Sequence, residues 1–340
     1  MDDVVRRAIS LAEQMSKSAS SVPWTNDKPW KQAWYLYASQ EQQWHAVEAH
    51  SQNRGQTAAV LRRLALYSWN IDFMLPFPNS RMRAAIRHLE PLINREPDEG
   101  TATVIFLQEC VESDLKLIAL DPWVQETFAI TDQSTENWQS GHYGTTTLID
   151  KRLAICDVFR VHYEQTRMQR DGLFVDVALV DASGGRKCVR LCNTHLESLA
   201  LEPPLRPPQM KLCAEYMHSS AADGAIVAGD FNAIQDFDKH LHTDNNLKDA
   251  FLECGGSEED SKGGHTWGQQ AAATQRNRFG TSRMDKIFFC GEAIKCTSFE
   301  RVGEGVEVED EAERKALTDL GLDKPWITDH LGVKAVFEVA

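Results

Sequence analysis

The stretch Ala225-Ile226-Val227-Ala228-Gly229-Asp230-Phe231-Asn232 places an acid and an amide directly behind a short apolar run. The apolar run predicts a buried β-strand, and Gly, Asp and Asn are favoured where a strand ends in a turn. Because Asp230 and Asn232 are two residues apart, their side chains point to the same side of an extended strand end. A Gly-Asp-x-Asn sequence alone is typical of a plain turn. Its position behind a buried strand favours a pocket that uses a carboxylate and an amide.

Three other apolar runs also end in polar residues: Leu64–Tyr67 before Asn70, Val104–Leu107 before Glu109, and Val189–Cys192 before His195. Residues 173–180 and 333–339 alternate more strictly, which predicts half-buried strands. Helical patterns over 81–94 and 208–219 separate some of the strands. This mixture of strand pairs and helices fits two packed sheets with helices outside better than a simple βαβ repeat.

Composition limits the class of protein. The chain has 340 residues, of which 42% are hydrophobic and 25% charged, so it can bury a full core as one large domain with appendages or as two medium ones. Its net charge of -14 argues against a protein that coats nucleic acid or anionic membrane non-specifically, because such binding needs a basic surface. A local basic cleft is still compatible with this charge.

The chain divides into a lead segment, residues 1–60, and a catalytic body, residues 61–340. Residues 4–15 have helical periodicity, and four tryptophans follow at positions 24, 30, 34 and 44. The tryptophans could form a ligand-stacking surface. We interpret them instead as aromatic contacts that dock a partly helical extension onto the main domain.

The eight cysteines lie mostly in apolar runs and include no C-x-x-C pair, which indicates reduced thiols rather than a disulfide scaffold. The first residues are acidic, no apolar leader follows, and no run approaches the ~18 apolar residues of a membrane span. We therefore expect an intracellular, soluble protein of the nucleus, the cytoplasm or both. We also expect it to act as a monomer.

Several of these polar residues allow a structural as well as a functional interpretation. A carboxylate at the end of a buried strand needs an ion pair or a bound cation, so Glu109 is either one partner of a pair or a metal ligand. Asn70 is either a turn cap or part of a site, and Asp72 is either a helix cap or a second ligand.

The Asp329-His330 pair is more specific, because an imidazole is suited to proton transfer near neutral pH and the neighbouring acid can bind metal or orient water. Asp285 lies on a strand with apolar neighbours and needs a partner, for which an imidazolium is well suited. Acids, amides and an imidazole at strand ends together are typical of a metal-assisted phosphoester hydrolase.

The ordered motifs resemble the endonuclease/exonuclease/phosphatase superfamily over roughly residues 64–340. They are Ser68-Trp69-Asn70-Ile71-Asp72, Leu107-Gln108-Glu109, Asn193-Thr194-His195-Leu196-Glu197-Ser198, Gly229-Asp230-Phe231-Asn232, Arg283-Met284-Asp285 and Thr328-Asp329-His330. The resemblance implies a DNase I-like α/β fold, a four-layer α-β-β-α sandwich, that hydrolyses phosphoesters with Mg2+ or alternatively Mn2+.

Within that superfamily, the motifs at 194–198, 265–268 and 283–289 are most similar to the 5′-tyrosyl-DNA phosphodiesterase branch. This resemblance implies that the partner is a DNA end carrying a 5′-phosphotyrosyl adduct left by a topoisomerase, and that water attack leaves a 5′-phosphate. The proline-rich run Glu202–Pro208 departs from the branch at a substrate-contact loop.

The resemblance also implies roles for the site residues. Glu109 would be the principal Mg2+ ligand, and Asn70, Asp72 and Asp329 would give direct or water-mediated support. The catalytic set would be five residues. Asp230 would position or deprotonate the attacking water, and Asn232 would hold that water or a phosphoryl oxygen. His330, oriented by Asp285, would stabilise the transition state or protonate the leaving group, and His195 would form a hydrogen bond to a non-bridging oxygen.

A substrate-binding rim is the least specific part of this set, because each candidate is singly a common surface residue. We assign to it Ser198, Trp267, Tyr143, Arg206, Arg276 and Arg278.

Two other functions compete with this one. The first is another phosphoesterase of the superfamily: an RNA deadenylase or nuclease, an abasic endonuclease, or a lipid or inositol phosphoesterase. The inositol branch is disfavoured because the chain has no Pro-x-Trp-x-Asp-Arg motif, and the lipid branch because no membrane segment or basic anchor is evident. The second is a non-catalytic binding protein on the same fold, which the complete set of polar strand-end residues disfavours.

Overall fold

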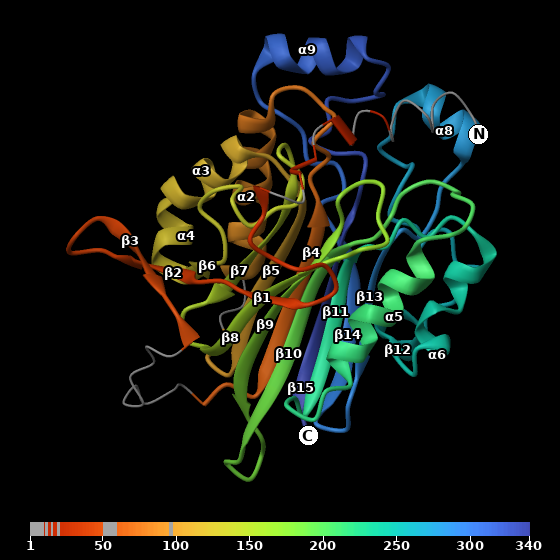
Figure 1. Ribbon diagram of the computed structural model, residues 1–340. Helices are drawn as coiled ribbons and strands as arrows, with labels where there is room; N and C mark the ends of the chain where they lie inside the picture. Colours follow the sequence, from red (N-terminus) through yellow and green to blue (C-terminus); the bar gives the residue numbers. More distant parts are fainter. Residues whose placement is uncertain (1–9, 11–12, 15, 19–20, 50–59, 95–97) are drawn as a thin grey trace.

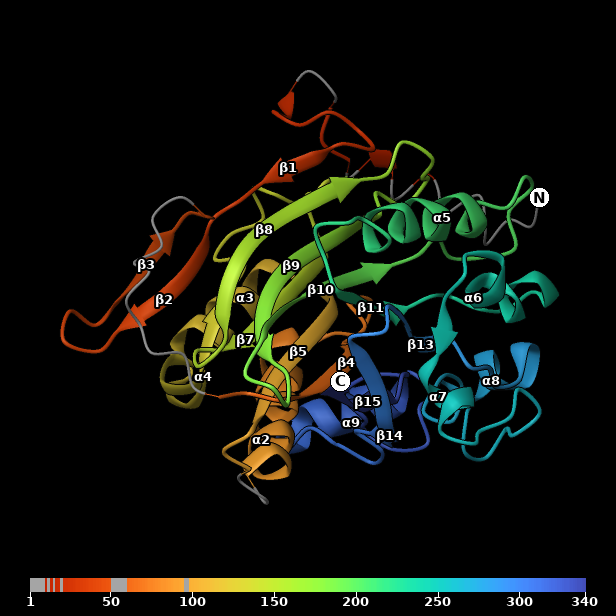
Figure 2. The same cartoon turned by 90° about the horizontal axis from the view of Figure 1, so that it is seen from below.

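Two mixed β-sheets lie face to face in the computed structural model, with helices on their outer sides (Figures 1 and 2). The structure describes residues 10, 13–14, 16–18, 21–49, 60–94 and 98–340. The helix predicted over residues 4–15 therefore lies mostly outside the described residues. None of the helices in the described part of the chain has the length and apolar character that a membrane crossing requires.

The first sheet has seven strands in the order β1-β8-β9-β10-β11-β13-β12. Their bounds are β1 Pro29–Lys31, β8 Ala154–His162, β9 Asp171–Val180, β10 Arg186–His195, β11 Gly224–Asp230, β13 Asp285–Cys290 and β12 Lys248–Asp249. Only β10 and β11 pair in parallel in this sheet, and all of its other pairs are antiparallel.

The second sheet has eight strands in the order β14-β15-β4-β5-β7-β6-β2-β3. Their bounds are β14 Ile294–Val302, β15 Gly332–Val339, β4 Arg63–Asn70, β5 Thr101–Cys110, β7 Gly144–Asp150, β6 Phe128–Ile130, β2 Trp34–Ala38 and β3 Gln43–Val47. Here β4 and β5 are the parallel pair.

Helices cover the outer face of each sheet. The helices α2 Pro78–Asn94, α3 Glu112–Leu120 and α4 Pro122–Thr127 pack on the eight-stranded sheet, and α5 Arg206–Met217 and α6 Leu241–Asp244 pack on the seven-stranded sheet. Other short helices in the described part of the chain are the 3-10 helix η3 Asp236–Lys239, α7 Ala250–Glu253, α8 Ala273–Phe279 and α9 Glu311–Asp319.

The alternation of side chains along β4 shows how both faces of a sheet become buried. Leu64 and Leu66 face the other sheet, whereas Ala65, Tyr67 and Trp69 face the helices α2 and α3. The helices thus bury the outer faces of the sheets, which a two-layer sandwich would leave exposed to water. The predicted four-layer α-β-β-α fold is confirmed.

The prediction of two half-buried strands is right for β15 and wrong for β9. Along β15, Lys334, Val336 and Glu338 are less buried than their neighbours. Along β9, every residue from Asp171 to Val177 is buried. The reason is a second apolar layer on its outer face, where the Phe174 ring stacks on Phe159 and lies 5.5 Å from Tyr216 of α5.

The lead segment contributes strands to both sheets. Strand β1 pairs with β8 of the seven-stranded sheet, and β2 pairs with β6 of the eight-stranded one. Each tryptophan of this segment contacts the rest of the chain: Trp24 stacks on His162, the Trp30 and Trp44 indoles donate to Asn137 and Ala119, and Trp34 lies in the core between the sheets.

The two parallel pairs determine where the polar strand ends meet. In register, Asn70 of β4 lies beside Gln108 of β5, and His195 of β10 lies beside Asp230 of β11. Because β4 and β5 contact β10 and β11 across the core, these carboxyl ends gather at one edge of the sandwich. Asp285 begins the antiparallel strand β13 opposite Asp230 and adds a further acid at the same edge.

Candidate active site

Asp230 lies at the centre of the candidate site. Its Oδ2 accepts a hydrogen bond of 3.0 Å from the Asn70 amide, and its Oδ1 accepts one of 2.8 Å from the backbone N–H of Asn232. The same carboxylate lies 3.3 Å from His195 Nε2 and 3.7 Å from His330 Nε2. Burial alone would raise the pKa of Asp230, but the charge of His330 and the hydrogen bond from His195 hold it well below its usual range.

Glycine is required immediately before Asp230. Gly229 has a φ of +151°, and a Cβ at this position would lie 1.7 Å from the carbonyl oxygen of Thr194 on the neighbouring strand. Only a residue without a side chain lets β11 approach β10 so closely. The Gly-Asp motif is therefore a packing requirement as well as a turn.

Three predicted site residues adopt the left-handed backbone conformation that most side chains avoid. Asp72, Glu109 and Asn232 have φ angles of 55°, 57° and 49°. Such conformations cost about 1 kcal/mol or more each and persist where the surrounding structure holds them. All three residues lie at or just beyond the carboxyl ends of the strands β4, β5 and β11.

His330 and Asp285 form a buried pair. His330 Nδ1 lies 2.8 Å from Asp285 Oδ2, and both side chains are almost fully buried. Burial would lower the pKa of His330, but the carboxylates of Asp285, Asp230 and Asp329 outweigh it and raise this pKa well above its ordinary value. These acids favour the imidazolium form of His330, and its Nε2 lies 3.7 Å from Asp230 Oδ2.

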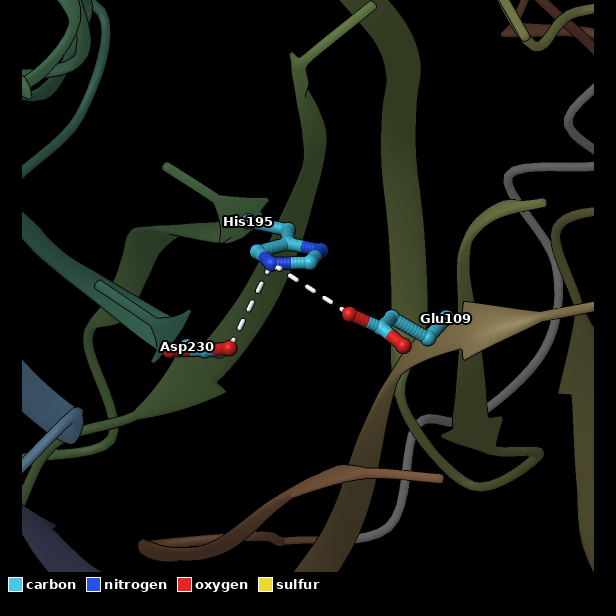
Figure 3. A group of neighbouring side chains, drawn as sticks. All are labelled: Glu109, His195 and Asp230. Carbon is cyan, nitrogen blue, oxygen red and sulfur yellow. Dashed lines mark ion pairs between the residues drawn. The ribbon is translucent and has the colours of Figure 1, made fainter. Parts of the chain in front are cut away.

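His195 is held by a different partner. Its Nδ1 lies 2.6 Å from Nη1 of Arg170. Because a guanidinium can only donate, Nδ1 is the acceptor and the ring proton lies on Nε2. That nitrogen faces Asp230 Oδ2 at 3.3 Å and Glu109 Oε1 at 3.7 Å (Figure 3). His195 therefore presents a donor to the pocket.

Three carboxylates gather beside this centre with few cations to balance them. Burial, together with the nearby charges of Asp329 and Glu109, raises the pKa of Asp72 to about 8, and the charge of Arg81 opposes this shift. The Glu109 carboxylate accepts from the Phe73 N–H at 2.9 Å, and Asp329 accepts from the Trp267 indole at 2.7 Å.

Crowded carboxylate oxygens with this excess of negative charge fit a hard divalent cation, which prefers oxygen ligands. Donor atoms of Glu109, His195 and Asp230 also lie within 4.8 Å of one another, as do those of Asp230, Asp285 and His330. The site therefore has acidic and histidine groups that could bind a metal.

The Asn70 side chain forms hydrogen bonds at both ends, and its direct or water-mediated support of a metal stays a prediction. Its side-chain oxygen accepts from the Asp72 N–H at 2.8 Å, while its amide nitrogen donates to Asp230. Both ends of this amide are thus engaged within the protein. We therefore assign Asn70 to the orientation of Asp230.

The predicted substrate rim is only partly brought to the site. Ser198 donates to the Asn232 side chain at 3.0 Å, and Trp267 pairs with His330 through an isolated β-bridge, so both lie at the centre. Arg276 and Arg278 lie on α8, where Arg276 pairs with Asp323 at 2.7 Å.

Arg206 and Tyr143 differ from the prediction of rim residues because the fold buries both. The Arg206 guanidinium is 2% exposed and forms a two-point contact with Asp238 of η3. Tyr143 is 5% exposed, its hydroxyl donates to the Met168 carbonyl at 2.6 Å, and its ring stacks on Phe73. Arg206 therefore anchors a loop and cannot contact substrate in this structure.

Sequence reasoning missed the residues that support the site. Arg81 of α2 donates to the carbonyls of Ile71 and Ile327 and so ties together the two loops that carry Asp72 and Asp329. Gln108 donates to Asn193 at 2.8 Å and links the two sheets directly behind the pocket. Polar residues inside apolar strands, as at Gln108 and Asn193, are the signal that could have identified this layer.

Comparison with known proteins agrees with this geometry. The model of the Endonuclease/Exonuclease/phosphatase family matches residues 67–330, as the motifs predict. A 5′-tyrosyl-DNA phosphodiesterase of Caenorhabditis elegans is 28% identical over 237 residues, which are 68% of this chain and 59% of that protein. One of Caenorhabditis briggsae is 28% identical over 233 residues, 67% of this chain and 60% of that protein. The chain spans about three fifths of the length of these curated relatives.

Solved structures share the fold. Truncated Caenorhabditis elegans TDP2 has a TM-score of 0.57 at 23% identity and covers 82% of this chain and 98% of its own. D. rerio TDP2 complexed with a single strand DNA product has a TM-score of 0.59 at 19% identity, with coverage of 82% and 99%. The expected resemblance is thus confirmed.

Proposed function

Because the chain belongs to the endonuclease/exonuclease/phosphatase family, we propose that it hydrolyses the phosphodiester bond between a tyrosine side chain and the 5′ end of DNA. The family supplies the reaction class, a metal-assisted hydrolysis of a phosphoester. The names of the relatives from the two nematodes suggest the substrate. The observation that carries the proposal is the buried contact of Asp230 with two histidines of different character, beside an excess of carboxylates.

Glu109, Asp72 and Asp329 would hold a divalent cation, with Mg2+ as the expected ion and Mn2+ as an alternative for the same oxygen donors. When bound, the ion would neutralise charge on the phosphate oxygens and make the phosphorus a better electrophile. The carboxylates need such a partner, because burial and mutual repulsion together raise the pKa of Asp72.

Asp230 would orient the attacking water and take its proton. The carboxylate is ionised, since its pKa is held low by the two histidines, and its direction is set by Asn70 and by the backbone of Asn232. One N–H of the Asn232 side chain donates to the Leu196 carbonyl at 3.0 Å. We assign its second N–H to a phosphoryl oxygen or to the water itself.

The two histidines would stabilise the charge that develops on the phosphate. His330, kept as an imidazolium by Asp285, would donate its Nε2–H to a phosphoryl oxygen in the transition state. His195, whose proton lies on Nε2, would donate to another. A tyrosine leaving group needs less protonation than an alkoxide, because the phenol pKa is ~10. The products would be free tyrosine hydroxyl and a 5′-phosphate.

The decisive experiment is cleavage of a single-stranded oligonucleotide that carries a 5′-phosphotyrosyl group by the purified protein in Mg2+. We expect rapid release that leaves a 5′-phosphate and is abolished by EDTA. Glu109→Gln should remove nearly all of this turnover while the Tm of the metal-free protein stays near the wild-type value. An active Glu109→Gln variant would contradict the metal assignment.

A panel of other phosphoesters separates this proposal from the other activities of the family. RNA tails, abasic DNA, inositol phosphates and sphingomyelin should be turned over at least about a hundredfold more slowly, because a change of leaving group and contacts costs several kcal/mol. Faster cleavage of any of these would move the assignment to that substrate and leave the metal-assisted chemistry in place.

A further inference from the structure

Two cysteines, one at the end of a short helix and one on a strand, lie in direct contact. Cys254 ends the short helix α7, and Cys296 lies on β14 at a point where the pairing with β15 shifts register. Their sulfur atoms are 3.5 Å apart. This distance is a van der Waals contact of two thiols and needs only a small approach to reach a covalent bond.

The contact joins the two sheets at one side of the sandwich. Helix α7 follows β12 directly, and β12 is an edge strand of the seven-stranded sheet. Strand β14 is an edge strand of the eight-stranded sheet. Figure 2 shows α7 beside β14 at this side. The rings of Phe251 and Phe299 lie 5.3 Å apart and hold the same two elements together.

The two thiols differ in exposure in the way that a reactive pair requires. Cys254 is exposed, whereas Cys296 is buried among the side chains of the core between the sheets. Burial raises the pKa of the Cys296 thiol well above its ordinary value. An oxidant in solution therefore meets Cys254 first, and Cys296 lies behind it as the resolving thiol.

Another close pair in the described part of the chain lacks this arrangement. Cys192 and Cys213 lie 4.0 Å apart, but both are buried and Cys213 also contacts the Tyr163 hydroxyl at 2.9 Å. No solvent path to either sulfur follows from these positions. The exposed thiol distinguishes the pair at the sheet edges.

We propose that Cys254 and Cys296 form a peroxide-driven disulfide that cross-links the two sheets. Hydrogen peroxide oxidises the Cys254 thiol to a sulfenic acid and is reduced to water. The Cys296 thiol then attacks the Cys254 sulfur, the S–S bond forms as the S–O bond breaks, and the leaving hydroxyl takes the proton of the Cys296 thiol to give a second water. The sum is one peroxide and two thiols giving one disulfide and two waters. This site is independent of the proposed phosphodiesterase reaction.

The test is peptide mapping of the full chain after a small excess of hydrogen peroxide, with alkylation of the remaining thiols. We expect a peptide pair linked through Cys254 and Cys296 and an intact chain lighter by two hydrogen atoms. The Tm should rise by roughly 3 to 10 °C, because the bond closes a long loop between the sheets, and dithiothreitol should reverse the rise.

Cys254→Ser is the informative variant, because an exposed serine leaves the fold unchanged, and it should abolish both the cross-link and the reversible Tm shift. Cys156→Ser is the matched control, since this half-buried thiol lies on β8, near the opposite edge of the seven-stranded sheet from β12, and it should behave as wild type. A sulfinic acid on Cys254 with Cys296 still alkylated, or a cross-link to another cysteine, would overturn the proposal.

Discussion

Two buried histidines in different parts of the molecule have opposite pKa shifts. His162 of β8 and His330 beside β15 are 1% and 6% exposed, so water screens neither ring. Burial lowers the pKa of His162 to about 4, whereas the pKa of His330 is raised well above its ordinary value. Burial alone therefore does not determine the charge of either ring.

The difference lies in the partners. The His162 ring stacks on Trp24 at 3.8 Å, its Nε2–H donates to the Asn137 carbonyl, and its Nδ1 has no hydrogen-bond partner among the described residues. His330 Nδ1 contacts Asp285 at 2.8 Å, and two further carboxylates lie within 4 Å of its Nε2. The surrounding acids thus favour the charged form of His330, which fits its proposed catalytic role, whereas the ring and the carbonyl around His162 favour the neutral form.

The arginine two residues before His162 completes this comparison. Arg160 is fully buried and contacts Asp132 at 3.1 Å and Asp171 at 2.9 Å. Its acids are thus compensated inside the protein. The acids around Asp72 are compensated only in part, because Arg81 lowers the pKa of Asp72 while Asp329 and Glu109 raise it, and the remaining negative charge leaves groups that could bind a metal.

The largest effect should come from exchanging the two histidines separately for glutamine. His330→Gln should lower kcat/KM on the phosphotyrosyl substrate by about a hundredfold to ten-thousandfold, because it removes a positioned cation from the transition state. His162→Gln should stay within about twofold of wild type, although both changes remove a buried imidazole. Steady-state cleavage assays measure the activity of both variants. Equal losses of activity would contradict the different roles of the two histidines.

Removal of the compensating arginine should have the next largest effect. Arg160→Met leaves two buried carboxylates unpaired and should lower the free energy of unfolding by about 3 to 5 kcal/mol in urea titrations. Lys31→Met breaks the ion pair of Lys31 with Asp157, in which the lysine is 63% exposed, and should change it by less than about 0.5 kcal/mol. A small loss at Arg160 would show that water reaches this cluster.

The pH dependence of stability tests the sign of the His162 shift. The unfolded state takes up a proton near pH 6.5, and the folded state does so only near pH 4, so the stability present above pH 6.5 is lost as the pH falls through this window. The loss should approach ~1.4 kcal/mol per pH unit. Comparison of wild type with His162→Gln by urea unfolding isolates this contribution, and parallel pH profiles would refute it.

The smallest change concerns the ring that covers His162. Trp24→Phe keeps an aromatic face but removes the indole hydrogen bond of 3.1 Å to Gln139. We expect a loss of about 1 kcal/mol in the free energy of unfolding, typical of one partly buried hydrogen bond. Thermal melts with matched urea titrations would measure it, and a loss above about 3 kcal/mol would mean that the ring itself repacks.

The polar strand ends were predictable from sequence because they depend on local patterns. An apolar run that stops at Asn70, Glu109, His195 or Asp230 indicates a buried strand, and parallel pairing brings such ends together. The order of the layers followed from the family resemblance.

Residues whose roles depend on distant packing could not be read in this way. Arginine is usually a surface residue, and Arg206 is buried here because it pairs with Asp238 of η3. The outer face of β9 is buried because aromatic residues of β8 and α5 cover it. Arg81 lies in the first turn of a helix, where nothing local indicates that its guanidinium holds two loops. The hydrogen bonds that Asn70 forms with Asp230 and Asp72 also depend on the tertiary structure and could not be predicted from local sequence.

The strands of the lead segment also affect the tendency of the protein to aggregate at high concentration. A bare strand edge is a template on which another chain can add, and this risk grows with the length of the edge. Here the edge of β8 is covered by β1, which has only three residues, and the edge of β6 is covered by the β2–β3 hairpin. The lead segment thus ends one side of each sheet with a short edge strand, β1 of three residues and β3 of five, which offers another chain little to pair with.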